Sequence, residues 1–168
     1  MKLFKQLIVM TSIALFSISA LAEVNVGLVD MRAALFSSDA AKEFTDSMVS
    51  KYKKQDLEVR AIGEEGQRLE MRLKNDAAIM SDSERAKMAS DLEEKIQEYK
   101  YRKGKLDKAL AEKRNEFLSD SKPKMDQAIN ELVKEEKLDL LIPREAALFA
   151  NQEMDYTDKI IKKLNKLN

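Results

Sequence analysis

The stretch MVSKYKKQDLEVRAIGEEGQRLEMRLKNDAAIMSDSERAKMASDLEEKIQEYKYRKGKLDKAL, residues 48–110, decides the fold because it carries two matched series of apolar residues. In both series the positions alternate spacings of three and four. Such spacing is the coiled-coil pattern, and its apolar stripe needs a partner helix to cover it. We therefore predict that residues 41–122 form an arm of two antiparallel helices. The apolar members of the two series are Met48, Tyr52, Val59, Ile62, Leu69 and Leu73, followed by Met88, Leu92, Ile96, Tyr99, Leu106 and Leu110.

The two series also predict which residues face each other across the arm. If the chain folds back near Ile79, apolar residues meet apolar residues, and the polar Gln55 falls opposite Lys103. Gly66 lies on the same seam, where close packing is expected, although Gly63 and Gly66 together also permit a bend in the helix. The expected apolar partners are Met48 with Leu110, Tyr52 with Leu106, Val59 with Tyr99, Ile62 with Ile96, and Leu69 with Met88.

Capping signals mark the ends of the two helices. Ser37-Ser38-Asp39 supplies an N-cap and a negative charge for a descending helix that we expect to end at Asp76. Ser81-Asp82-Ser83-Glu84 is a capping box of the Ser-x-x-Glu type, which starts the second helix after a tip near residues 76–81. An arm of roughly 40 residues per helix extends about 60 Å, since an α-helix rises 1.5 Å per residue.

The two ends of the chain predict a small body at the base of the arm. Residues 24–31 have the alternating apolar pattern of a strand, and residues 137–142 and 147–150 predict two more strands. Between the first strand and the arm, Arg32 to Phe36 is expected to form one helical turn. Asp155 is expected to cap an amphipathic closing helix.

The fold class that follows is α+β, a long antiparallel helical hairpin on a small β body. The body comprises residues 23–40 and 123–168, with Pro123 expected to kink or restart the helix that leaves the arm. A three-stranded sheet in about 64 residues, without disulfides or metal, is marginally stable alone and leaves strand edges open. We therefore expect the body to form an oligomer, whose subunit number this argument does not give.

The first 22 residues have the pattern of a secretory signal peptide. Lys2 and Lys5 make a positive start, residues 7–20 are apolar without charge, and Ala20-Leu21-Ala22 is a small-x-small cleavage signal. The alternative is a membrane anchor, but the apolar run is short for a span and a processing site follows it. We predict export and cleavage after Ala22.

The composition argues against catalysis. The chain has no cysteine and no histidine, which removes the usual nucleophile, general base and transition-metal ligands. Removing Lys2 and Lys5 from the 30 basic residues leaves 28 against 30 acidic ones, a net charge of −2 that does not indicate nucleic-acid binding. We predict no enzyme activity, no cofactor and no bound metal.

Some arm residues are not explained by the pairing of the helices. Exposed apolar residues are common in proteins, yet those off the seam are candidates for contacts with another polypeptide. A basic segment of the ascending helix is a candidate site for acidic segments or anionic lipid headgroups, although a solvated helical face also explains it. The candidate apolar contacts are Leu57, Met71, Ile79, Met80 and Tyr101, and the candidate anion patch is Lys95, Lys100, Arg102 and Lys105.

Taken together, the opening VNVGLVDMRAALF, the charged hairpin, the segment LDLLIPREAALFANQEMDYTDKIIKKLNK and the signal peptide resemble the Skp (OmpH-like) family of periplasmic chaperones. The resemblance implies a homotrimer whose strands form a small β-barrel and whose arms enclose a cavity. It also implies that the cavity holds unfolded outer-membrane β-barrel proteins, without ATP. The residues that match the assembling body are Val26, Leu28, Val29, Leu140, Ile142, Leu148 and Phe149.

The chain departs from the family in its charge. Family members are often strongly basic on the arms, whereas this chain is near neutral, so the resemblance transfers no lipopolysaccharide-binding site. Capture of clients would depend more on apolar and short-range contacts. The alternative function is that of a structural or adaptor protein of the cell envelope, in which the hairpin is a spacer or binds one defined partner.

Overall fold

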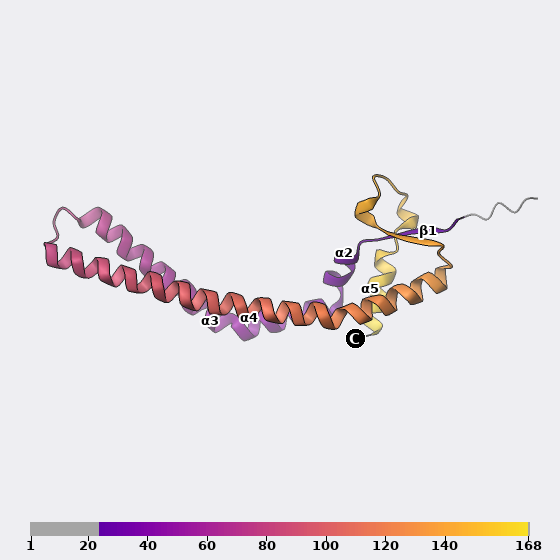
Figure 1. Cartoon of the computed structure of the whole chain (residues 1–168), viewed down its shortest axis with the longest axis horizontal. Coiled ribbons are helices and arrows are strands. Elements are labelled where there is room, and N and C mark those ends of the chain that lie inside the picture. Colours follow the sequence, from indigo (N-terminus) through magenta and orange to yellow (C-terminus); the bar gives the residue numbers. More distant parts are fainter. Residues whose placement is uncertain (1–23, 168) are drawn as a thin grey trace, which may run out of the picture.

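A computed structural model describes residues 24–167, so the predicted signal peptide and its cleavage site lie outside the described residues. The molecule is a small body with one long helical hairpin extending from it (Figure 1). The elements in chain order are β1 (Val26–Val29), α2 (Met31–Ser37), α3 (Asp39–Asp76), α4 (Asp82–Glu136), β2 (Leu140–Pro143), the 3₁₀ turns η1 (Arg144–Ala146) and η2 (Gln152–Met154), and α5 (Thr157–Lys166).

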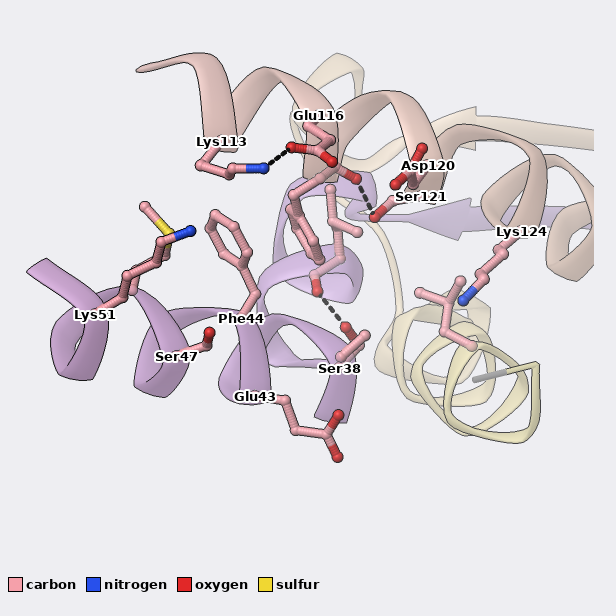
Figure 2. Close-up of a pocket in the computed structure, with 15 residues that line it drawn as sticks. Ser38, Glu43, Phe44, Ser47, Lys51, Lys113, Glu116, Asp120, Ser121 and Lys124 are labelled. Atoms are coloured by element: carbon pink, nitrogen blue, oxygen red, sulfur yellow. Dashed lines mark hydrogen bonds and ion pairs between the residues drawn. The ribbon is translucent and has the colours of Figure 1, made fainter. Parts of the chain in front are cut away.

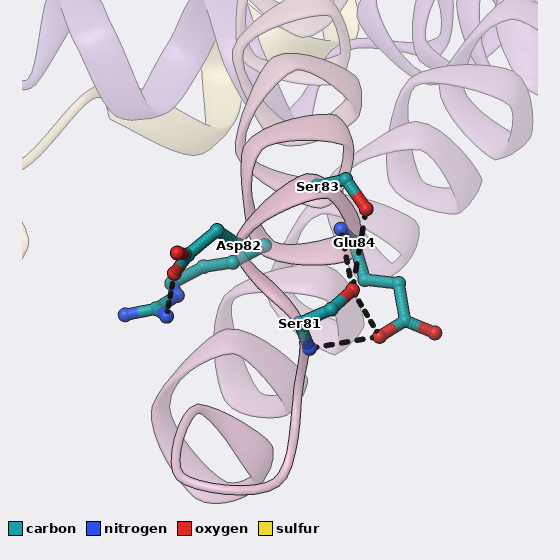
Figure 3. Close-up of polar contacts among 5 residues, drawn as sticks. Ser81, Asp82, Ser83 and Glu84 are labelled. Atoms are coloured by element: carbon teal, nitrogen blue, oxygen red, sulfur yellow. Dashed lines mark hydrogen bonds and ion pairs between the residues drawn. The ribbon is translucent and has the colours of Figure 1, made fainter.

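The caps that start the two arm helices are those that the sequence predicts. The Ser38 side chain accepts a hydrogen bond from the backbone N–H of Ala41 and starts α3. At the tip, the backbone N–H of Ser81 donates to Glu84 Oε2 at 2.9 Å, and the backbone N–H of Glu84 donates to Ser81 Oγ at 3.3 Å (Figure 3). The hydrogen bonds from Ser81 lower the pKa of the Glu84 carboxyl. This reciprocal box confirms the predicted start of α4.

The faces by which α3 and α4 pack are also those predicted. Every apolar residue of the two series is buried or half-buried, and within residues 42–120 only Val59 and Leu106 are fully buried. The two polar seam residues, Gln55 and Lys103, are exposed. The coiled-coil spacing therefore identified the correct stripe on each helix.

The predicted register between the helices is wrong by about one helical turn. The rings of Phe44 and Phe117 stack with centroids 4.6 Å apart, whereas folding near Ile79 would place Phe44 opposite Arg114. Salt bridges of 3.1 Å from Lys95 to Glu65 and 3.5 Å from Arg102 to Glu58 follow the same shifted register. A seam with spacings of three and four repeats itself every layer, so a shift by one layer still brings apolar residues together.

The close approach of the two helices is at Gly63 and not at Gly66. A Cβ atom on Gly63 would lie 3.2 Å from the ring of Tyr99, tighter than ordinary van der Waals contact. A Cβ on Gly66 would lie 4.0 Å from the Cβ of Lys95, which is an ordinary contact. The shifted register explains the difference, because it brings the bulky Tyr99 side chain against Gly63.

The helix that leaves the arm does not restart at Pro123. Pro123 lies inside α4, which runs without interruption from Asp82 to Glu136 and curves as it enters the body (Figure 1). Proline lacks the N–H for one helical hydrogen bond, which a long helix tolerates as a bend. The helix ends at Lys137, whose backbone is left-handed with φ 52°.

The body contains a two-stranded parallel sheet and not the predicted three-stranded one. β1 pairs with β2 in the register Val26 to Leu140 through Val29 to Pro143. The other edge of β1 is occupied by an isolated bridge between Leu28 and Asp155. Residues 147–150 pair with neither strand and form an irregular segment, and the outer edge of β2 has no partner within the described residues.

The core of the body lies between β1, α2, α5 and the last turns of α4. Leu132 and Ile160 have no exposed surface, and Ala34 of α2 packs in the same cluster. The buried members of this cluster are Val29, Ala34, Met125, Ala128, Leu132, Leu138, Ile160 and Leu164.

Salt bridges connect α5 to α4 at the edge of this core. Lys163 Nζ lies 2.6 Å from Glu135 and 3.6 Å from Glu131, and Lys159 Nζ lies 2.7 Å from Glu136. The hydrogen bond between Lys163 and Glu135 raises the pKa of the lysine and lowers the pKa of the glutamate. The N-cap of α5 is Tyr156, without a side-chain cap, and not Asp155 as expected. Asp155 lies one residue earlier, where its Oδ1 accepts a hydrogen bond of 2.9 Å from the backbone N–H of Thr157.

Gly27 is required for the packing of the sheet on the body. A Cβ on Gly27 would lie 2.9 Å from both the Leu138 and Tyr156 side chains, and 3.0 Å from Leu141. We expect Gly27→Ala to lower the free energy of unfolding by about 1–3 kcal/mol through overpacking. Urea unfolding followed by circular dichroism measures the change.

Gly104→Ala is the matched control for Gly27→Ala. No atom lies within 4 Å of a Cβ on Gly104, which occupies an exposed position in the interior of α4. We expect this variant to gain about 0.5–1 kcal/mol, since alanine favours the helix. A Gly27→Ala protein as stable as the wild type would contradict the close contacts at β1.

Candidate functional site

The described residues offer neither a cluster that could hold a metal ion nor a helix that could span a membrane. Among residues 24–167 no cluster of three acidic side chains is placed to hold a metal ion. In the same part of the chain, no helix combines the length and the apolar character needed to cross a membrane. The surfaces that the sequence singled out are the exposed apolar residues of the arm, its basic segment and the residues of the body.

The arm presents apolar side chains to solvent away from its seam. Tyr101 is 71% exposed, Ile79 at the tip 86%, and Leu57 and Met71 each more than half exposed. Met80, the fifth predicted contact residue, is half-buried in the tip turn, where its backbone N–H donates to Asp76. Packing within the chain does not account for the first four side chains. They are spread along the arm and do not converge on one spot.

The predicted anion patch is partly neutralised by neighbouring glutamates. Lys95 pairs with Glu65 and Glu98, and its hydrogen bond to Glu65 raises the pKa of the Lys95 ammonium. Arg102 lies 3.0 Å from Glu98 and 3.5 Å from Glu58. Within residues 24–167, Lys100 and Lys105 have no ion-pair partner. The side chains therefore do not form one strong positive surface.

An open cleft of about 740 Å³ lies at the root of the arm, between α3 and α4 and beside α5. In Figure 2 the Phe44 ring points from α3 toward α4, and it stacks there on Phe117. Above it, Lys113 pairs with Glu116, an interaction that raises the pKa of the lysine and lowers the pKa of the glutamate. The cleft is lined by three lysines and three carboxylates, so it has no net charge to select an ion.

Sequence reasoning missed the two phenylalanines of this cleft. Phe44 lies four residues before Met48, and Phe117 lies seven residues after Leu110, so both continue the seam spacing by one or two layers. Extending each series toward the body would have found them. Their stacking would also have fixed the register of the arm.

A smaller pocket of about 240 Å³ lies midway along the arm, where α3 and α4 meet. Val59 and Leu106, the two buried seam residues, are among its lining residues. Tyr52 of α3 and Tyr101 of α4 also line it, and the exposed surface of its lining is mostly apolar. Of these residues, only Tyr101 was expected from the sequence to contact another molecule.

The body also carries an exposed apolar edge. Leu148 and Phe149 project from the irregular segment after η1, at 108% and 85% exposure, and Leu140 of β2 is half-exposed. A salt bridge of 3.0 Å between Arg144 and Asp155 joins the ends of this segment. Burial raises the pKa of the Asp155 carboxyl, but the hydrogen bonds from Thr157 and the charge of Arg144 together outweigh it, so the pKa is lowered.

The remaining predicted assembly residues are less accessible. Val26 and Ile142 of the sheet are half-buried, and Leu28 and Val29 are buried inside the chain itself. Packing within one chain therefore already explains the burial of Leu28 and Val29, without contacts to another subunit.

These observations define the class of protein: a small α+β body carrying a long two-helix arm, with apolar side chains exposed on both. Residues 25–164 match the model of the OmpH-like outer membrane protein family. The chain belongs to this family.

Two relatives illustrate the match. The chain is 27% identical over 167 residues to a Skp-like protein of Pseudomonas aeruginosa, and the alignment covers 99% of each chain. Its fold matches the crystal structure of a candidate outer membrane chaperone (OmpH-like) of Caulobacter crescentus with a TM-score of 0.59. That comparison has 21% identity and covers 88% of this chain and 87% of the other. The predicted resemblance and fold class are thus confirmed.

Proposed function

We propose that the mature protein is an ATP-independent holdase of the periplasm that binds unfolded outer-membrane β-barrel proteins and prevents their aggregation. The observation that carries the proposal is the set of exposed apolar side chains along an arm whose seam is already packed. Membership of the OmpH-like family and the similarity to an OmpH-like chaperone structure support it. Binding alone can protect an unfolded chain by mass action, so no chemistry is required.

The proposed working form is a homotrimer assembled through the body, with the arms enclosing a client. The exposed Leu148 and Phe149 and the free outer edge of β2 support this assembly, since a protein on its own rarely leaves such groups uncovered. Single apolar contacts on an arm are weak. Several arms acting on one client raise the effective concentration of binding sites and so the overall affinity.

Aggregation of a client barrel protein tests the proposal. Urea-unfolded outer-membrane barrel is diluted into buffer without ATP, and light scattering is recorded at rising ratios of the mature protein. We expect suppression near one trimer per client. A variant in which the four exposed residues among the predicted contacts are changed to serine is expected to suppress aggregation several-fold less well at the same ratio. These residues are Leu57, Met71, Ile79 and Tyr101.

Two outcomes contradict the proposal. If the wild type does not suppress aggregation of the client at any ratio, the protein is not a holdase. Capture of one stoichiometric folded partner from envelope extract, with no barrel precursors, favours instead an adaptor whose arm is a spacer. The circular dichroism of the serine variant provides the control, because the four side chains are exposed and their replacement leaves the seam intact.

A further inference from the structure

The mid-arm pocket is built at the most protected part of the hairpin. Its lining includes Val59 and Leu106, the only buried residues within 42–120, each of them less than a tenth exposed. Two tyrosines, Tyr52 and Tyr101, also line it from opposite helices, and Tyr101 is 71% exposed. A rigid seam thus presents an apolar depression next to an uncovered aromatic ring.

The size of the pocket restricts what it can hold. Its volume of about 240 Å³ lies below the range of about 300–1,000 Å³ that is usual for whole small-molecule ligands. A single side chain of a longer polypeptide is the appropriate occupant. Tyrosine neighbours favour an aromatic one, since aromatic pairs gain about 0.5–1.5 kcal/mol beyond the burial of their area.

The charged side chains beside the pocket also affect which polypeptide segment it can bind. Arg102 also lines it, but its guanidinium is held between Glu58 and Glu98 at 3.5 and 3.0 Å. Lys105 is exposed and, within the described part of the chain, has no ion-pair partner. An ammonium group in this position is available to a carboxylate on the bound segment or to the face of an inserted ring.

We propose that this pocket binds an aromatic side chain of an unfolded polypeptide, preferentially one with an acidic residue beside it. The inference rests on the proposed function and names the feature of the client that the arm recognises. Transmembrane β-strands carry girdles of aromatic residues at both membrane interfaces, so an unfolded barrel supplies such a side chain many times along its length. Repeated weak capture at this pocket gives affinity without a defined sequence.

The protein contains no tryptophan, so a client tryptophan can be followed without background. The probe is a short unstructured peptide with one Trp flanked by Asp, compared with a second peptide in which Lys replaces Asp. With the wild type, we expect the Trp emission to shift to shorter wavelength, and the Asp peptide to bind more tightly. Lys105→Glu is expected to abolish or reverse that preference.

Two variants test the pocket itself. Ala109 lines it and is half-buried, so Ala109→Leu fills it without changing any charge or helix propensity appreciably. Tyr101→Ala removes the exposed aromatic wall. We expect each to weaken binding of the Asp peptide by about three- to tenfold, which corresponds to the worth of one aromatic pair. Val49→Ala is the control, because Val49 of α3 is 64% exposed, lies outside the pocket and is not one of the predicted contact residues.

The outcomes separate this inference from the proposed function. The inference about the pocket is wrong if the Asp peptide binds equally well to the wild type, Ala109→Leu and Tyr101→Ala, even if the wild type suppresses aggregation. An equal loss of affinity in Val49→Ala also overturns it, since the pocket would then have no special part in binding. If the peptide binds in the pocket but the protein protects no barrel client from aggregation, the inference about the pocket stands and the proposed holdase function is wrong.

Discussion

Replacing Leu148 and Phe149 together by serine is expected to convert the mature protein from a trimer to a monomer. Both side chains are almost completely exposed in the single chain, so their replacement costs the protomer no packing. In an assembly each would be buried, and full burial of such a side chain contributes about 1.5–3 kcal/mol. Summed over the copies in one oligomer, this loss is large relative to the stability of a small interface.

Sedimentation equilibrium measures the change directly. The wild type is expected to show three times the mass of one mature chain, and the double variant the mass of one. Ile79→Ser is the matched control: Ile79 is equally exposed but lies at the arm tip, far from the body (Figure 1), and its replacement should leave the trimer intact. A double variant that remains trimeric at low micromolar concentration would show that assembly uses another surface.

Leu132→Ala is expected to have the largest effect on the stability of the body. Leu132 is completely buried, between the α4 end and α5, and shares its cluster with Ile160 and Ala34. Removing a buried leucine side chain costs about 2–5 kcal/mol, because transfer energy is lost and a cavity remains. For a body of this size such a loss is a large fraction of the total stability.

Urea unfolding at fixed protein concentration measures this effect, since oligomerisation makes apparent stability depend on concentration. Leu118→Ala is the control, on the same helix but 38% exposed, and should change the free energy of unfolding much less. Equal effects of the two substitutions would show that the last turns of α4 are not the centre of the core.

The arm illustrates which features a sequence can predict. The side chains of Ser38, Ser81 and Glu84 hydrogen-bond to backbone groups within three residues of themselves. Their capping role therefore depends only on the local sequence and was predicted correctly. The apolar stripe is equally local, because helical periodicity alone decides which side chains share a face. Both helices therefore begin at the expected caps and pack through the expected faces.

The candidate site was predicted less completely. Exposure of Leu57, Met71, Ile79 and Tyr101 followed from their positions off the seam. Neutralisation of Lys95 and Arg102 did not follow, because their glutamate partners include residues of the other helix, and those contacts depend on the register. The mid-arm pocket was missed for the same reason.

The sequence by itself determined that this protein is a capped, amphipathic helical hairpin on a small α+β body, because those signals act over a few residues. Only the tertiary structure decided the register, the close approach at Gly63, and the absence of a third strand at residues 147–150 within the chain. A repeating apolar stripe is satisfied almost equally by several registers, and a short apolar segment becomes a strand only where another strand pairs with it. Both choices depend on contacts between residues distant in sequence, which no local pattern specifies.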